Sequence, residues 1–100
     1  MKKIEAVIRP EKLKAVIEKL KSMGLKELNT ADFNNYNLEK EERAIKTKLE
    51  FVLNYAEVDK YVEAVKNTVQ TGDPGDGKIF VYDLENAVKI RTGEEGVKAL

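Results

Sequence analysis

The residues best suited to binding chemistry lie in one short run, Thr71–Lys78, which holds three glycines, a proline and a terminal lysine. Glycine lets the main chain approach a ligand closely and adopt positive φ, and consecutive N–H groups in such a turn can form an anion-binding nest. A lysine at the end of the run supplies a point charge suited to phosphate. The alternative is an ordinary tight turn that feeds a strand, because Pro74-Gly75 and Asp76-Gly77 are strong turn signals. Local chemistry alone therefore leaves two hypotheses open.

Composition excludes several other kinds of site. The chain has no histidine and no cysteine, so imidazole base catalysis, Ser-His-Asp triads, thiolate metal sites and disulfides are ruled out. Eighteen basic residues balance eighteen acidic ones, which argues against broad electrostatic capture of nucleic acid or of an anionic membrane. No apolar run approaches the length of a membrane span and no signal peptide is recognisable, so we expect a cytoplasmic protein without membrane insertion.

The elements that must position the glycine run follow from hydrophobic periodicity. A half-buried strand is expected over Lys3–Arg9, followed by a helix that starts at Pro10 and stops at Gly24. Extended structure follows at Leu25–Phe33, and a polar loop, with a short helical turn at its end, is expected over Asn34–Arg43.

The second half of the pattern repeats the first. A strand is expected over Ile45–Leu53, and a helix begins at Asn54 with a capping-box-like start and continues to Val69. The strand Lys78–Tyr82 comes next, then a short extended piece at Val88–Arg91 and a polar tail. The order β-α-β-β-α-β predicts one α+β domain over residues 1–100. Its fold is ferredoxin-like, an antiparallel sheet with two helices on one face, an open second face and a short C-terminal extension.

Three segments together resemble the PII signal-transduction family. They are residues 1–10, 71–81 and 88–94, which correspond to the family's opening strand, its nucleotide-binding B-loop and its C-terminal C-loop, in the family's order. Residues 46–50 are also similar to the family's third strand, so only Asn29–Ile45 lies outside the resemblance.

The resemblance implies a homotrimer that binds ATP or ADP in clefts between neighbouring subunits, and it leaves a requirement for Mg²⁺ open. The expected nucleotide-binding residues come from the first and third strands, the B-loop and the C-terminal segment. They are Val7, Glu50, Val52, Thr71, Gly72, Gly75, Asp76, Gly77, Lys78, Lys89 and Arg91. Asp76 and its neighbours match the phosphate-binding loop, and the first- and third-strand residues match the adenine pocket.

The spacing of the basic pair Lys89 and Arg91 also predicts an anion contact independently of the family resemblance. Two residues apart on an extended segment, the two side chains should project to the same side and could offset polyphosphate charge together with Lys78. The alternative is a solvated strand face. Lys89 stands where the family usually has arginine, and a lysine lacks the bidentate guanidinium.

One departure from the family lies in residues 33–43, where its long T-loop is expected. About a dozen residues are missing, and neither the Arg-Gln-Lys-Gly run nor the glutamine that orients Mg²⁺ and 2-oxoglutarate has a counterpart. We therefore expect no 2-oxoglutarate sensing, and Tyr36 does not fall in the tyrosine modification motif.

Three functional hypotheses follow. The first is a non-enzymatic adenine-nucleotide sensor that regulates a target protein, such as a membrane transporter or a metabolic enzyme, through a shortened T-loop. The second is a scaffold trimer without nucleotide response. The third is a weak ATPase, although no Walker-type phosphate loop is present.

Overall fold

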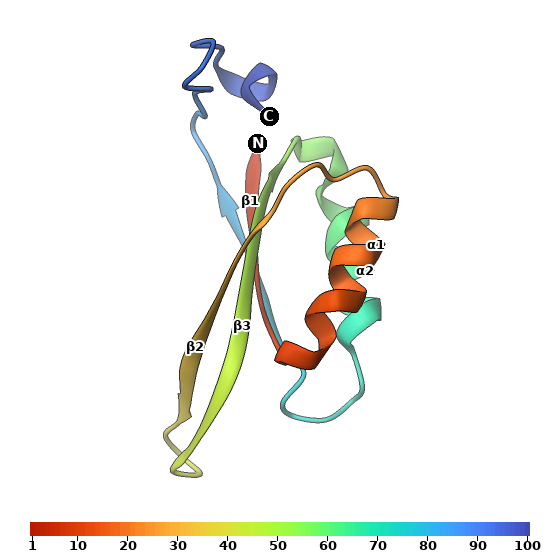
Figure 1. Cartoon of the computed structure of the whole chain (residues 1–100), viewed down its shortest axis with the longest axis vertical. Helices are drawn as coiled ribbons and strands as arrows, with labels where there is room; N and C mark the ends of the chain where they lie inside the picture. The colour runs from red at the N-terminus through yellow and green to blue at the C-terminus, as the bar shows by residue number, and fades with distance from the viewer.

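Four strands form one antiparallel sheet in the order β2-β3-β1-β4, and two helices cover one face of it (Figure 1). The computed structural model describes all residues, 1–100. The elements are β1 (Lys2–Ile8), α1 (Leu13–Ser22), β2 (Asn29–Asn37), β3 (Glu42–Leu53), α2 (Val58–Val69) and β4 (Gly77–Asp83), with short 3-10 helices η1 (Pro10–Lys12), η2 (Tyr55–Glu57) and η3 (Gly96–Ala99). This is the ferredoxin-like arrangement that the sequence predicted. Neither helix is long and apolar enough to cross a membrane.

The core lies between the sheet and the helices, as the alternating pattern of β1 and β3 predicted. Every second residue is buried from Ile4 in β1 and from Thr47 in β3, and the helices contribute one apolar stripe each. The buried cluster comprises Ile4, Ala6, Ile8, Val16, Leu20, Leu49, Phe51, Leu53, Val58, Tyr61, Val65 and Val69. Thr47 is the one buried polar side chain, and its hydroxyl donates to Asp32 Oδ1 at 2.6 Å.

The predicted helix boundaries are confirmed. Pro10 opens η1, which leads into α1, and Gly24 follows the helix with φ of +101°, a conformation that glycine adopts without strain. Asn54 caps η2, and its side chain accepts a hydrogen bond from the Ala56 N–H. The connections between strands and helices therefore lie at the residues that the sequence predicted.

The expected loop at Asn34–Arg43 was wrong in extent. β2 continues to Asn37 and β3 begins at Glu42, so only residues 38–41 connect the strands. A two-stranded ribbon exposed on both faces has no hydrophobic periodicity to reveal it, because main-chain pairing alone holds it together. The turn closes with the Lys40 N–H donating to Asn37 Oδ1 at 3.0 Å, and Glu41 adopts a positive φ of +54°.

The C-terminal segment also differs from the prediction. In the expected extended piece only Val88 pairs, in an isolated bridge with Glu95, and the chain reverses direction between them. The Gly93 N–H donates to the Lys89 carbonyl at 2.7 Å, and the predicted polar tail contains the short helix η3. Gly93 and Gly96 have positive φ, which permits this reversal. The segment extends beyond the end of the sheet (Figure 1).

Candidate functional site

A cavity of about 720 Å³ lies between the glycine loop and the β2–β3 hairpin. The strand register explains its walls: Val7 pairs with Lys78 across β1 and β4, and Phe33 pairs with Lys46 across β2 and β3. All four side chains belong to the sheet face that the helices leave open. This volume is typical of sites for small-molecule ligands and cofactors.

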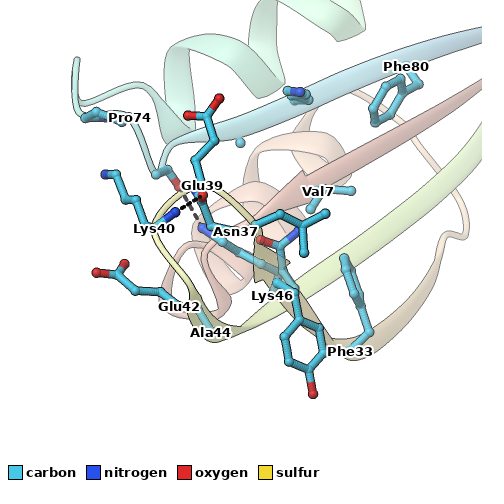
Figure 2. A pocket seen from close by; sticks show the side chains of 16 residues that line it. Val7, Phe33, Asn37, Glu39, Lys40, Glu42, Ala44, Lys46, Pro74 and Phe80 are labelled. Atoms are coloured by element: carbon cyan, nitrogen blue, oxygen red, sulfur yellow. Dashed lines mark hydrogen bonds between the residues drawn. The ribbon is translucent and has the colours of Figure 1, made fainter.

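The two ends of the cavity differ in chemistry (Figure 2). Val7, Phe33 and Phe80 form an apolar end. The rest of the lining is mixed: Glu39, Lys40, Glu42, Lys46 and Lys78 carry charge, Gly75 and Gly77 present main chain, and Tyr36, Leu38, Ala44 and Pro74 add apolar surface. The cavity can therefore receive a molecule that has both an apolar ring and a charged group.

The glycine loop is tied to the hairpin by Lys46. Its Nζ donates to the Gly75 carbonyl oxygen at 2.9 Å, across the cavity wall. Three lysines line the cavity, Lys40, Lys46 and Lys78, against the two carboxylates of Glu39 and Glu42. The lining thus carries a small positive excess, which favours an anion locally even though the whole chain has no net charge.

Gly77 occupies a position that no other residue fits. Its φ is +115°, and a Cβ built there would lie 1.9 Å from the Val7 carbonyl oxygen. The loop can therefore enter β4 against β1 only with glycine at this position.

Asp76, between two cavity-lining glycines, turns its carboxylate away from the cavity and into the loop. Oδ1 accepts from Arg9 Nη1 at 2.6 Å and from the Thr71 hydroxyl, and Oδ2 accepts from the N–H groups of Thr71 and Gly72 at 2.7 and 2.8 Å. The hydrogen bonds from Thr71, more than those from Arg9 and Gly72, hold the pKa of Asp76 well below its ordinary range. The carboxylate is therefore ionised at neutral pH.

The structure brings together only some of the predicted site residues. Val7, Gly75, Gly77 and Lys78 line the cavity. Thr71, Gly72 and Asp76 belong to the same loop but do not line it.

Glu50 and Val52 lie on the open sheet face outside the cavity. Glu50 is engaged there, because its carboxylate pairs with Lys3 Nζ at 3.2 Å.

Lys89 and Arg91 lie in the C-terminal segment and do not line the cavity of their own chain. Arg91 sits in a turn rather than on an extended strand, so the argument that alternation aligns the two cations was wrong.

Sequence reasoning missed Lys46, Phe33 and Phe80 as lining residues. Phe33 and Lys46 face the cavity because β2 and β3 pair in one particular register, and no local pattern distinguishes Lys46 from the other lysines. The open-face position of Phe80 could have been read from its alternation with Ile79 in β4, because Ile79 packs against the core.

Comparisons with known proteins agree with this architecture. A family model described as "Nitrogen regulatory protein P-II" matches residues 1–94. A nitrogen regulatory protein P-II of Pasteurella multocida (strain Pm70) is 39% identical over 112 residues, with all of both chains covered.

Solved structures show the same similarity. Arabidopsis thaliana PII bound to citrate superposes with a TM-score of 0.89 at 30% identity, covering 99% of this chain and 91% of that one. The B. subtilis GlnK-ATP complex superposes with a TM-score of 0.85 at 37% identity, covering 99% of this chain and 94% of that one.

Proposed function

The chain belongs to the nitrogen regulatory protein P-II family, and we propose from this premise that it is a signalling protein that binds ATP or ADP. The observation that supports the proposal is one cavity lined both by the glycine-loop residues Gly75, Gly77 and Lys78 and by the apolar residues Val7 and Phe80. A similar protein, B. subtilis GlnK, has been solved as a complex with ATP.

The proposed binding mode uses both ends of the cavity. The nucleotide base would pack against the apolar end, where burial of ring surface contributes about 25 cal/mol per Å². The phosphates would lie along the glycine loop, because glycines allow close approach of the main chain. Lys78 and Lys46 would supply charge-assisted contacts, and Lys46 would then exchange the Gly75 carbonyl for a phosphate oxygen.

We propose that the active species is a homotrimer in which a neighbouring subunit completes each site. Two features support this. Only 14 of 100 residues are buried in the single chain, and the C-terminal segment exposes large apolar side chains such as Ile90, at 97%. Docked on a neighbour, this segment would bury that surface and could bring Lys89 and Arg91 to the phosphates. Glu50 and Val52, on the open sheet face, would then lie at the subunit boundary.

The hairpin turn is proposed as a shortened T-loop that contacts the target protein. The P. multocida relative aligns over 112 positions against the 100 residues of this chain, a difference of twelve. A four-residue turn at 38–41 is a natural place for such a difference. The residues of this turn, Leu38, Glu39, Lys40 and Glu41, include neither the glutamine nor the glycines of the long loop, so we do not expect 2-oxoglutarate to bind. A bound nucleotide would influence the hairpin by contact with Lys46 and Glu39, which line the cavity.

Isothermal titration calorimetry with ATP and with ADP tests the proposal. Lys78→Met should weaken binding about 10- to 100-fold, because a hydrogen bond to a charged group contributes about 1.5–3 kcal/mol. Arg91→Ala should weaken it similarly if the neighbour's segment completes the site. Lys14→Met and Arg43→Ala are matched controls outside the cavity and should leave the affinity unchanged. Absence of binding to wild type at millimolar nucleotide would refute the proposal.

A further inference from the structure

The carboxylate of Asp76 accepts hydrogen bonds from groups of the loop and from Arg9, and it does not line the cavity. It accepts four hydrogen bonds, two on each oxygen, from Arg9, Thr71 and Gly72. Its side chain is only 19% exposed. These four hydrogen bonds occupy the acceptor positions of the carboxylate, and its negative charge is directed away from the cavity lining. The Asp76 carboxylate therefore has no direct contact to offer an anionic ligand.

The same carboxylate joins three parts of the chain that must come together for the loop to have its shape. Arg9 comes from the end of β1, 67 residues away, while Thr71 and Gly72 follow α2 at the start of the loop. Thr71 is itself held, because its hydroxyl also accepts from the Asp73 N–H at 3.2 Å. The loop is therefore closed on itself through Asp76 and fastened to the sheet through Arg9.

Arg9 supports the loop from behind. Its guanidinium packs under Gly75, where an added Cβ would lie 2.7 Å from Nη2, and Arg9 does not line the cavity. Lys46, which lines the cavity, donates to the Gly75 carbonyl. Arg9, outside the cavity, would therefore keep its contact with Gly75 when Lys46 exchanges the Gly75 carbonyl for a phosphate oxygen.

We propose that Asp76 is a positioning residue for nucleotide binding, which fixes the glycine loop through Arg9 and Thr71 so that Gly75, Gly77 and Lys78 are presented to phosphate. The proposal deepens the proposed function and rests on it. Preorganisation of this kind raises affinity because the ordering cost of the loop is met during folding rather than on binding. The negatively charged side chain of Asp76 thus favours binding of an anionic ligand indirectly, because it orders the glycine loop that contacts the ligand.

The test compares Asp76→Asn with Asp73→Asn. Both substitutions remove one negative charge from the same loop, but no side-chain hydrogen bond or ion pair holds the Asp73 carboxylate. ATP affinity should fall about tenfold or more in Asp76→Asn, because an amide nitrogen cannot accept from Arg9 and Thr71 as a carboxylate does. Asp73→Asn should stay within about twofold of wild type, or bind slightly more tightly because a negative charge is removed. Equal ATP affinity in Asp76→Asn and wild type would overturn the proposal.

Amide hydrogen exchange separates a failure of this proposal from a failure of nucleotide binding. In the nucleotide-free protein, the Thr71 and Gly72 amides should lose protection in Asp76→Asn and keep it in Asp73→Asn. If wild type binds no nucleotide, the proposed function fails regardless of the exchange result. If wild type binds but protection of these two amides is unchanged in Asp76→Asn, the positioning role fails alone.

A second pair of variants covers the case in which Asp76→Asn does not fold. Thr71→Val removes the hydroxyl that donates to Asp76, and Thr71→Ser keeps it. We expect ATP affinity to fall in Thr71→Val and to stay near that of wild type in Thr71→Ser, although residue 71 does not line the cavity. Equal ATP affinity in the two variants would contradict it.

Discussion

Replacement of Gly77 by alanine is the sharpest perturbation that the structure offers. A Cβ at this position would lie 1.9 Å from the Val7 carbonyl oxygen and 3.0 Å from the Val7 carbonyl carbon. Both are main-chain atoms of β1, so no side-chain rotation can relieve the contact. Real Cβ contacts do not fall below about 3.0 Å, so the strands must separate by about 1 Å or more at the start of β4.

The cost has two parts. Alanine at a φ of +115° is strained by about 1–2 kcal/mol. A separation of about 1 Å would also stretch one or two ladder hydrogen bonds beyond bonding distance, at about 1 kcal/mol each. The free energy of unfolding should therefore fall by about 3 kcal/mol, a large fraction of the roughly 5–15 kcal/mol typical of a domain.

Urea denaturation at one fixed protein concentration measures the change, because the proposed subunit association would make stability concentration-dependent. Gly72→Ala is the matched control: its φ is +93°, but an added Cβ meets nothing within 4 Å. It should cost only the backbone strain, about 1–2 kcal/mol. If Gly77→Ala costs no more than Gly72→Ala, the argument from close strand approach is wrong.

Three further predictions concern individual side chains. Glu41→Gly should raise the free energy of unfolding by about 0.5–1 kcal/mol, because glycine relieves the positive φ of +54°. Glu39→Gly, at negative φ, should lower it, and a loss of stability in Glu41→Gly would refute the assigned turn. Glu39→Gln should strengthen ATP binding about two- to fivefold at low salt, and ADP binding less, because a negative charge is removed from the lining. Glu85→Gln, outside the cavity, is the control for Glu39→Gln in the same calorimetric titrations. If Glu39→Gln changes ATP and ADP affinity equally, the proposed position of the phosphates is contradicted. The stability difference between wild type and Asp76→Asn should be constant from about pH 7 to about pH 5 and shrink below about pH 4, because the folded pKa of Asp76 is lowered and protonation removes the stabilisation. A difference that grows as pH falls, in urea titrations, would contradict the assigned hydrogen bonds.

The fold was predictable because local signals agreed with one another. Alternation in β1 and β3, Pro10 and Gly24 at the helix boundaries, and the Asn54 cap each indicated the element that the structure shows. The hairpin extension was not predictable, because pairing such as Asn35 with Ala44 buries nothing and leaves no periodic trace.

The candidate site was predictable for its loop and, through the family resemblance, for Val7 on the first strand. Glycine and lysine types in one run indicated Gly75, Gly77 and Lys78, but a residue type alone does not say which way a side chain turns. Asp76 was predicted as a nucleotide-binding residue from its place in the loop, and the loop sequence did not show that its carboxylate accepts from Arg9, a partner 67 residues away. Lys46 was missed for the same reason, because its contact with Gly75 depends on the assembled sheet.

A crystal structure of the protein grown with ATP would show directly where the nucleotide binds. The account predicts density for the triphosphate along Gly75, Gly77 and Lys78, with the base against Val7 and Phe80 and with cations of a neighbouring subunit closing the site. Nucleotide bound elsewhere, or this cavity still empty at millimolar ATP, would contradict it.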